Sequence, residues 1–348
     1  MAIEIIGTGR AVPPNRVTND DLAAKVETSD EWIRSHTGIG SRYIAGDDIA
    51  ASDLALEAAK NALAMVGGYS GSDPAERDRV AAVEAASIGM IVVGTATPDF
   101  IGVPSVACIV QHGLGATGAG AMDVTAGCTG FIYGIETAAG MLSLTKRYSR
   151  ALVIGTEALS KVMDWSDRGT CVLFGDGAGA VVLERTDAPR EGAGRRGVVR
   201  TTLGADGSGA GSLLFRRGGT RFPFMAGETL EKGIHVEMNG QEVYNFAVKA
   251  VTETIGTLMQ EEGFGADDVA WIVPHQANAR IIAAAGKRLR IPAEKFFLNI
   301  EEYANTSAAS IPIALDELNR GGRLARGDVV VTVGFGGGLT YGGNVIIW

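Results

Sequence analysis

The stretch AMDVTAGCTGFIYGIETA at residues 121–138 has a counterpart in FLNIEEYANTSAASIPIALDEL at residues 297–318, and this pair decides the fold class. In both stretches a short apolar run leads through a turn into residues with helical spacing. Each stretch follows a strand-like run and a helix, and each precedes another apolar run and a glycine-rich hairpin. The same order of parts, found twice, indicates a duplicated unit.

The remaining parts of both halves follow this order. The first half contains IGMIVVGTAT (88–97), ALVIGTEALS (151–160) and FGDGAGAVVLE (174–184). The second contains VAWIVPHQAN (269–278) and DVVVTVGFGGGLTYGGNVIIW (328–348). Apolar, β-branched runs that alternate with helices predict an α/β protein.

The repeat divides the chain into an N-terminal half, residues 1–186, and a C-terminal half, residues 187–348. The first segment of the second half, residues 187–240, is rich in Gly, Arg and Thr and has little periodicity. Such segments are typical of functional loops or linkers. The register of the repeat places Cys128 opposite Asn305, each at the start of a predicted helix.

Composition excludes several classes of protein. The chain has 348 residues, of which 46% are hydrophobic and 20% charged, as expected of a globular protein with a sizeable core. Its net charge of −9 argues against a general nucleic-acid binder, but allows one local basic patch. No secretory signal and no run of roughly 20 apolar residues is visible. Three cysteines without a C-x-x-C spacing indicate neither disulfides nor a metal site, so we expect a cytoplasmic protein with free thiols.

Cys128 is the candidate nucleophile. It lies in Gly-Cys-Thr-Gly before a predicted helix, where the positive end of the peptide dipoles lowers a thiol pKa and favours thiolate. Cys108 and Cys171 lie in apolar segments and are interpreted as small buried side chains. Taken alone, Cys128 fits that structural role equally well.

His275 and Asn305 are its candidate partners. His275 follows a buried strand, and ligand sites in α/β proteins collect at strand ends. Each side chain alone also fits a structural, hydrogen-bonded role. The glycine segments 174–179 and 335–338 do not fit a dinucleotide fingerprint, because neither joins an early strand to a helix. We interpret both as hairpin turns, one of which supplies a backbone N–H to an oxyanion.

Seven motifs occur together in a fixed order, and with them the chain resembles the β-ketoacyl-acyl-carrier-protein synthase III family, which initiates type II fatty-acid synthesis. The resemblance covers essentially the whole chain. The motifs are TSDEWI (28–33), AGCTGF (126–131), DRGT (167–170), FGDGAGA (174–180), VPHQAN (273–278), NTSAAS (305–310) and FGGGLTYG (335–342).

The resemblance implies a thiolase-like fold, with two duplicated βαβαβαββ halves in a five-layered αβαβα arrangement. It also implies a homodimer that condenses an acyl-CoA primer with malonyl-acyl-carrier protein, with loss of carbon dioxide and without metal or cofactor. Cys128 would carry the acyl group, and His275 and Asn305 would stabilise the enolate. The backbone N–H groups of Cys128 and Gly337 would form the oxyanion hole.

Three further groups of residues are implied by the same motifs. Trp32, Arg168 and His36 would bind coenzyme A, but His36 stands where the family usually has Arg, so either His36 or Arg34 would hold the adenine. The acyl pocket would be lined by Phe174, Leu159 and Val103, the last reaching across a dimer. The carrier protein would contact Gln276, Ala277, Asn278, Ala279 and Arg280, together with Lys287 and Arg288 on the same predicted helix.

Other functions remain open from the sequence. A related decarboxylating enzyme of quinolone or polyketide biosynthesis would use the same trio. A hydroxymethylglutaryl-CoA synthase would need a glutamate acid for which no motif stands out. A cysteine hydrolase would use His275 as a base for Cys128, and a non-catalytic thiolase-like protein would be expected to lack one of the three. The length and branching of the primer are not readable from the sequence.

Overall fold

The structure is a computed structural model that describes residues 1–187, 194–225, 227 and 235–348. Parts of the irregular segment 187–240 therefore lie outside the described residues. The strands are β1 (Ala2–Ala11), β2 (Asn15–Thr18), β3 (Ser41–Ile44), β4 (Ile88–Gly94), β5 (Gly120–Val124), β6 (Arg150–Glu157), β7 (Gly177–Thr186), β8 (Gly197–Ala205), β9 (Leu213–Phe215), β10 (Val236–Met238), β11 (Val269–Pro274), β12 (Val329–Gly336) and β13 (Thr340–Ile347).

The α-helices alternate with these strands as predicted. They are α1 (Asn19–Ala23), α2 (Asp30–Thr37), α3 (Ala51–Val66), α4 (Pro74–Ala85), α5 (Val106–Leu114), α6 (Gly130–Leu144), α7 (Gly240–Glu262), α8 (Ala279–Leu289), α9 (Ile300–Tyr303) and α10 (Ser310–Arg320). Short 3-10 turns, η1 (Gly127–Thr129) and η5 (Ser307–Ala309), lead directly into α6 and α10. None of the described helices is long and apolar enough to cross a membrane.

Two sheets form the framework. The first has the order β1-β7-β6-β4-β5, in which β4 is parallel to β5 and β6, while β7 is antiparallel to β6 and β1. The second has the order β11-β12-β13-β8, with β11 parallel to β12 and the other pairs antiparallel. The four strands β11, β12, β13 and β8 of the second sheet therefore correspond, in this order, to β4, β6, β7 and β1 of the first sheet.

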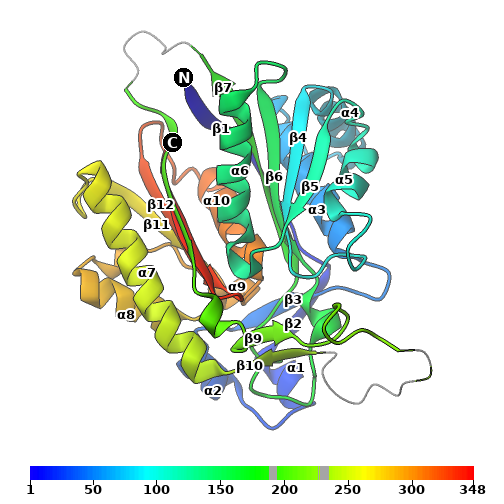
Figure 1. Cartoon of the computed structure of the whole chain (residues 1–348), viewed down its shortest axis with the longest axis vertical. Coiled ribbons are helices and arrows are strands. Elements are labelled where there is room, and N and C mark those ends of the chain that lie inside the picture. Colours follow the sequence, from blue (N-terminus) through cyan, green and yellow to red (C-terminus); the bar gives the residue numbers. More distant parts are fainter. Residues whose placement is uncertain (188–193, 226, 228–234) are drawn as a thin grey trace.

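The helices cover these sheets in layers (Figure 1). The α6 and α10 helices lie between the sheets, where one apolar core joins Phe131 and Ile135 of α6 to Ile311 and Leu315 of α10 and to strands of both sheets. A second core packs α3 and α5 on the outer face of the first sheet. A third packs α7 and α8 on the outer face of the second sheet. The result is the predicted five-layered αβαβα arrangement.

The two halves differ at one edge. The counterpart of β5 in the second half is the segment around Phe296, which forms a single parallel bridge to Ile272 instead of a strand. The strict βαβαβαββ pattern expected for both halves is therefore incomplete in the second. Apolar character alone did not distinguish a paired strand from this short bridge.

Candidate active site

Two of the three candidate residues lie beyond the carboxyl ends of parallel strands, and the third lies between two short helical turns. Cys128 lies in η1 after β5, and His275 directly follows β11. Asn305 lies between α9 and η5, at the position that the repeat predicted. Several short elements gather at the lower end of the molecule in Figure 1. They are β2, β3, β9, β10, α1 and α2.

Glycines let the backbone approach Cys128 closely. Gly127 has φ +51°, and a Cβ there would lie 2.8 Å from the Gly337 nitrogen. A Cβ on Gly336 would lie 2.4 Å from the Cys128 nitrogen. Both positions therefore require glycine, because any side chain would separate the two backbone segments. As a result, Gly337 and Cys128 line one cavity.

The environment of the thiol differs from the sequence expectation. Cys128 is only 8% exposed, and this burial raises the pKa of its thiol to about 12, against a hydrogen bond from Ser307 that lowers it. The expectation of a lowered pKa was therefore wrong for the unliganded chain, because desolvation of the thiolate outweighs the favourable effects. Cys128 is a thiol at neutral pH and needs a proton acceptor to become a nucleophile.

His275 is a buried neutral base with one free nitrogen. Its Nδ1 lies 2.8 Å from the Ser310 hydroxyl oxygen, while its buried Nε2 has no hydrogen-bond partner among the described residues. Burial lowers the pKa of the imidazole to about 3, so the ring is neutral at physiological pH. The Phe335 ring packs edge-on against it, with centroids 5.5 Å apart.

Asn305 is held with its amide donor available. Its backbone N–H donates to the Leu173 carbonyl, and its backbone carbonyl accepts from the Gly175 N–H, both at 3.0 Å. Its side-chain oxygen accepts a 2.8 Å hydrogen bond from the Ser307 N–H. Because the oxygen is engaged by a donor, the NH₂ group is the end left to meet a ligand.

Two cavities meet at Cys128. The trio cavity, with a volume of ≈ 250 Å³, is lined by Cys128, His275 and Asn305 together. The apolar cavity, ≈ 200 Å³, is lined by Cys128 and by side chains that include Leu159 and Phe174. Thus three residues far apart in the sequence face one space, and a second space beside the thiol is suited to an apolar chain.

A buried carboxyl group is hydrogen-bonded to a residue that lines the apolar cavity. Glu157, at the end of β6, accepts hydrogen bonds from the Thr97 hydroxyl at 2.6 Å and from the Ala96 N–H at 3.1 Å. Burial raises its pKa to about 7, although hydrogen bonds from Thr97 and Ser307 lower it. Because Ala96 lines the apolar cavity, its hydrogen bond to Glu157 holds part of the cavity wall in place.

Two of the three residues expected to bind coenzyme A belong to the lining of the trio cavity. Trp32 and His36 line it, and their rings stack with centroids 4.4 Å apart. The Arg168 guanidinium lies 5.2 Å from the Trp32 ring centroid. Arg34, the alternative to His36, forms ion pairs with Asp30 and Glu301 and does not line this cavity.

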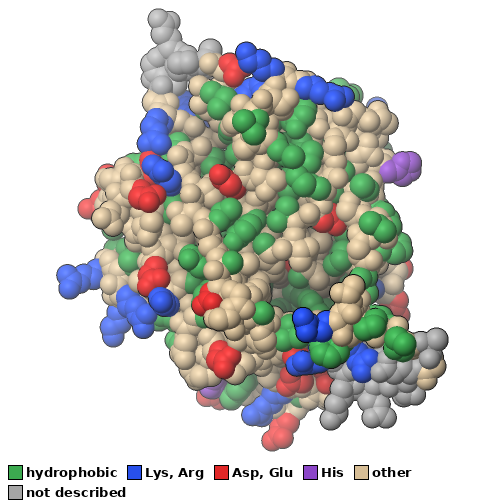
Figure 2. Space-filling model, in the orientation of Figure 1, with side chains coloured by type: hydrophobic (Ala, Val, Ile, Leu, Met, Phe, Trp, Pro, Cys, Tyr) green, Lys and Arg blue, Asp and Glu red, His purple; other side chains and the backbone are tan. Residues whose placement is uncertain are grey.

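The expected carrier-protein residues separate into two groups. Arg280, Lys287 and Arg288 are exposed on α8, and Figure 2 shows basic side chains gathered over this helix. Ala277 and Asn278 line the trio cavity, and Ala279 begins α8 half-buried.

Gln276, also expected to contact the carrier protein, is buried in this chain. Its side chain is 1% exposed. Its side-chain amide donates to the Pro274 and Phe297 carbonyls and accepts from the Asn299 N–H, so the side chain is directed into the protein. Val103, expected at the acyl pocket, is 84% exposed and lines neither cavity in the single chain.

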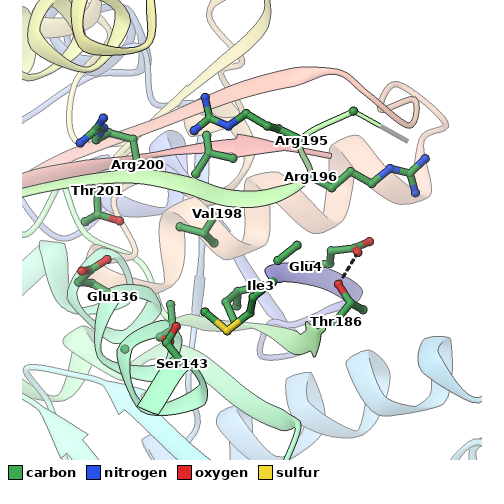
Figure 3. A pocket seen from close by; sticks show the side chains of 16 residues that line it. Ile3, Glu4, Glu136, Ser143, Thr186, Arg195, Arg196, Val198, Arg200 and Thr201 are labelled. Atoms are coloured by element: carbon green, nitrogen blue, oxygen red, sulfur yellow. Dashed lines mark hydrogen bonds between the residues drawn. The ribbon is translucent and has the colours of Figure 1, made fainter. Parts of the chain in front are cut away.

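A further cavity lies away from the trio. It has a volume of ≈ 730 Å³ and lies between the start of β1, α6 and β8 (Figure 3). Its Arg195 and Arg200 are both paired with Glu262, and it contains none of the trio. Across the described residues, no group of three or more His, Cys, Asp or Glu is placed to hold a metal ion.

Three contributors were missed by sequence reasoning. Ser307 and Ser310 lie in NTSAAS and Glu157 lies in ALVIGTEALS, so each was inside a recognised stretch but had no assigned chemistry. The signal available was a small or acidic polar side chain in an otherwise apolar or alanine-rich run. Their partners, His275 and the 95–97 turn, are distant in the sequence.

Two family models match the chain. The model described as 3-Oxoacyl-[acyl-carrier-protein (ACP)] synthase III matches residues 122–207, and 3-Oxoacyl-[acyl-carrier-protein (ACP)] synthase III C terminal matches residues 259–348. The chain is 45% identical to Beta-ketoacyl-[acyl-carrier-protein] synthase III of Caldanaerobacter subterraneus subsp. tengcongensis, over 100% of this chain and 98% of the relative.

Solved structures also resemble the chain over nearly its full length. The 3-oxoacyl-[acyl-carrier-protein] synthase III from Aquifex aeolicus VF5 is 38% identical, with a TM-score of 0.84 and 100% of both chains covered. The priming beta-ketosynthase from the R1128 polyketide biosynthetic pathway is 31% identical, with a TM-score of 0.85 over 99% of this chain and 96% of that one. These likenesses confirm the predicted thiolase-like fold. By family model, full-length sequence identity and fold, the chain belongs to the 3-oxoacyl-[acyl-carrier-protein] synthase III family.

Proposed function

We propose that this protein condenses an acyl-CoA primer with malonyl-acyl-carrier protein, releasing carbon dioxide and starting fatty-acid synthesis. The observation that carries this proposal is that Cys128, His275 and Asn305 line one cavity. A thiol, a neutral imidazole and an amide donor are the groups that thioester exchange and enolate stabilisation require. The reaction needs no metal or redox cofactor.

In the first stage the Cys128 sulfur attacks the acyl-CoA thioester. The developing oxyanion is stabilised by the backbone N–H groups of Cys128 and Gly337, whose segments abut at this point. The acyl chain enters the apolar cavity beside Leu159 and Phe174. Because one thioester replaces another, the acyl group stays activated for the second stage.

In the second stage malonyl-acyl-carrier protein enters the trio cavity and loses carbon dioxide. The electron pair left on the α-carbon is delocalised onto the thioester oxygen, which accepts hydrogen bonds from His275 Nε2 and from the free amide end of Asn305. The carbanion then attacks the acyl group on Cys128, and the sulfur leaves.

The two substrates use neighbouring surfaces. The adenine of coenzyme A binds between the Trp32 ring and Arg168, with His36 stacked on Trp32 as its support. The acidic carrier protein docks on Arg280, Lys287 and Arg288 of α8, which begins beside the trio cavity.

The protein acts in the cytoplasm as a homodimer. In the described part of the chain, β5 is an edge strand that pairs only with β4. Phe100, Ile101 and Val103 are 52%, 71% and 84% exposed, and precede α5 near that edge. An exposed strand edge with neighbouring apolar side chains is a surface that a second copy would cover. Val103 would then reach the partner's acyl cavity.

The test is to supply acyl-CoA and malonyl-acyl-carrier protein to the purified protein and to quantify carbon dioxide, β-ketoacyl product and free acid. We expect carbon dioxide and product in equal amounts, with little free acid. Release of free acid from acyl-CoA without carbon dioxide would instead identify a cysteine hydrolase. A competition among acetyl-, isobutyryl- and longer acyl-CoAs in the same assay determines the primer.

A further inference from the structure

Ser307 lies between the candidate nucleophile and a buried carboxyl group. Its side chain is hydrogen-bonded to the Cys128 thiol and also to the Glu157 carboxyl group. Ser307 lines the apolar cavity together with Cys128 and is 2% exposed. Glu157 is fully buried at the end of β6. The hydroxyl group therefore joins two ionisable groups from which water is largely excluded.

The backbone holds Ser307 in this place. Its φ of +48° lies in the left-handed region, where residues other than glycine are uncommon and tend to cluster at functional sites. Its N–H donates to the Asn305 side-chain oxygen at 2.8 Å. The N–H of the next residue, Ala308, donates to Glu157. The position of the Ser307 hydroxyl is therefore fixed by hydrogen bonds on both sides.

The Ser307 hydroxyl has one hydrogen and two acceptors for it. The first acceptor is the Cys128 sulfur when it carries negative charge. The second is the Glu157 carboxylate, which also accepts from the Thr97 hydroxyl at 2.6 Å and from the Ala96 N–H at 3.1 Å. Because a single hydrogen is available, Ser307 cannot donate to both acceptors at once.

The charge of Glu157 decides between these acceptors. An ionised carboxylate only accepts, so it takes the Ser307 hydrogen, and the Ser307 oxygen is then left to accept from the Cys128 thiol. A protonated carboxyl group instead donates its own hydrogen to the Ser307 oxygen. In that state the Ser307 hydrogen is free to point at the Cys128 sulfur.

We propose that Ser307 is a further catalytic residue, which donates a hydrogen bond to the Cys128 sulfur as that sulfur gains negative charge, and that protonated Glu157 directs this hydrogen toward the sulfur. Glu157 acts only through Ser307 and is a positioning residue. This inference rests on the proposed function, in which the Cys128 sulfur is the nucleophile. Hydrogen bonds to charged groups are stronger than those between neutral groups, so this donor favours the thiolate that burial disfavours.

Ser307 keeps its own hydrogen in both stages of the reaction. In acylation the Cys128 thiol releases its proton to water, the sulfur forms a bond to the acyl carbon, and the bond from that carbon to the coenzyme A sulfur breaks. The coenzyme A thiolate takes up one proton from water. In condensation the bond from the acyl carbon to Cys128 breaks, and its electron pair returns to the sulfur beside Ser307. The Cys128 thiolate then takes up one proton from water.

Two titratable groups act on this pair of side chains. Burial raises the pKa of Glu157 to about 7, whereas burial lowers the pKa of His275, which lines the trio cavity with Cys128, to about 3. The 95–97 turn and η5 supply the other donors to Glu157, and these donors are hydroxyl and backbone N–H groups without charge. His275 therefore stays neutral near pH 7, and the Ser307 hydrogen is available to Cys128 below about pH 7 and bound by Glu157 above it.

The test measures how fast Cys128 reacts with methyl methanethiosulfonate, a small reagent that transfers a methylthio group to a thiolate and releases methanesulfinate. Mass spectrometry of peptides separates Cys128 from the exposed Cys108. At pH 6, Ser307→Ala should react about tenfold more slowly than wild type, the effect of one lost hydrogen bond to a charged group. At pH 9 the difference should be less than about threefold, because Glu157 already holds the hydrogen in the wild type. Wild-type rates in Ser307→Ala at both pH values would overturn the proposal.

Glu157→Gln separates the hydrogen bond from the charge. Glutamine has an NH₂ donor beside its acceptor oxygen, so it resembles the protonated acid at every pH. At pH 9 this variant should react about tenfold faster than wild type, and at pH 6 at the wild-type rate. In the Ser307→Ala background, the same substitution should change the rate at pH 9 by less than about threefold. An equal gain with and without the Ser307 hydroxyl would mean that the charge acts directly on the sulfur, and would overturn the role of Ser307.

Thr306→Val is the matched control. It removes the neighbouring hydroxyl, which is fully buried and has no hydrogen-bond partner within the described part of the chain. Its Cys128 should react at the wild-type rate at both pH values. Ser307→Gly is the second variant, because glycine adopts a positive φ without strain and also lacks the hydroxyl. It should reproduce the effect of Ser307→Ala even if the alanine variant folds poorly.

Coenzyme A release connects this measurement with the proposed function. At pH 6, Ser307→Ala should release coenzyme A from acyl-CoA about tenfold more slowly, with little change in KM, because the lost interaction belongs to the reacting sulfur and not to substrate binding. An increase in KM with an unchanged maximal rate would contradict the catalytic role. If the wild type formed no β-ketoacyl product while its Cys128 still reacted as described, the proposed function would fail and the role of Ser307 would stand.

Discussion

Replacing Glu157 with Gln should change how the stability of the protein depends on pH. Glu157 is fully buried, and burial raises its pKa from an ordinary value of 4.5 to about 7. Each unit of difference in pKa between the folded and unfolded states corresponds to about 1.4 kcal/mol, so this pKa difference changes the free energy of unfolding by about 3 kcal/mol. Glutamine keeps the size of the side chain and one acceptor oxygen for Thr97 and Ala96, but has no charge to desolvate.

The sign follows from proton binding. Between pH 4.5 and about 7 the folded chain keeps the Glu157 proton while the unfolded chain has lost it. The folded state therefore binds more protons, and the free energy of unfolding falls as pH rises through this window. Above about pH 7 both states are ionised and the loss is complete. His275, whose lowered pKa opposes folding in acid, is present in both proteins and cancels from their difference.

Urea unfolding of wild type and Glu157→Gln at pH 5 and pH 8 measures this effect. We expect the wild type to lose about 2–3 kcal/mol more than the variant between these two pH values. Glu253→Gln, which removes one exposed carboxyl group from α7, is the matched control and should follow the wild type. Parallel pH profiles for wild type and Glu157→Gln would refute the reasoning that burial keeps this carboxyl protonated.

Three further predictions concern the substrates. Reversing the charge of Arg280 and Lys287 should raise the KM for malonyl-acyl-carrier protein severalfold and spare acylation by acyl-CoA; a fall in both half-reactions together would contradict docking on α8. Asn305→Ala should slow carbon dioxide release by about 10²-fold or more, the effect of one lost donor, and leave coenzyme A release less affected. Trp32→Ala should raise the KM for acyl-CoA but not for acyl-pantetheine, which lacks adenine; an equal rise for both would rule out adenine stacking between Trp32 and Arg168.

Much of the fold and the convergence of the trio could be predicted because they depend on the order of parts along the chain. The repeat fixes which strands are equivalent, and the ends of parallel strands meet at one edge of a sheet. Cys128 and His275 each follow such a strand, so their neighbourhood follows from the topology. The resemblance to a family supplied the chemistry that the spacing alone left open.

Properties that depend on depth of burial could not be read in the same way. The sequence shows that Cys128 precedes a helix, but not that the chain encloses it enough to raise its pKa. Gln276 lies in a recognised motif, yet it turns inward to contacts with Phe297 and Asn299 that only the folded chain brings together. The bridge at Phe296 likewise depends on how far the chain runs beside β11.

The contact between Ser310 and His275 illustrates the same limit. A serine in an alanine-rich run at the start of a helix has no distinctive pattern, and its hydroxyl most often bonds a nearby carbonyl. Its contact with His275 joins residues 35 positions apart, and depends on α10 lying against the end of β11. Hydrogen-bond partners of this kind follow from packing between helices and strands, which periodicity does not specify.

Mass-spectrometric mapping of the acylated protein tests the central claim most directly, because the chain has three cysteines with different surroundings. After incubation with acyl-CoA, the acyl group should be found on Cys128 and not on Cys108 or Cys171. On addition of malonyl-acyl-carrier protein, the acyl group should leave Cys128 of the wild type, and carbon dioxide and β-ketoacyl product should appear. In the His275→Ala, Asn305→Ala double variant, the acyl group should stay on Cys128. An acyl group on another cysteine, or transfer at the wild-type rate without His275 and Asn305, would contradict the account.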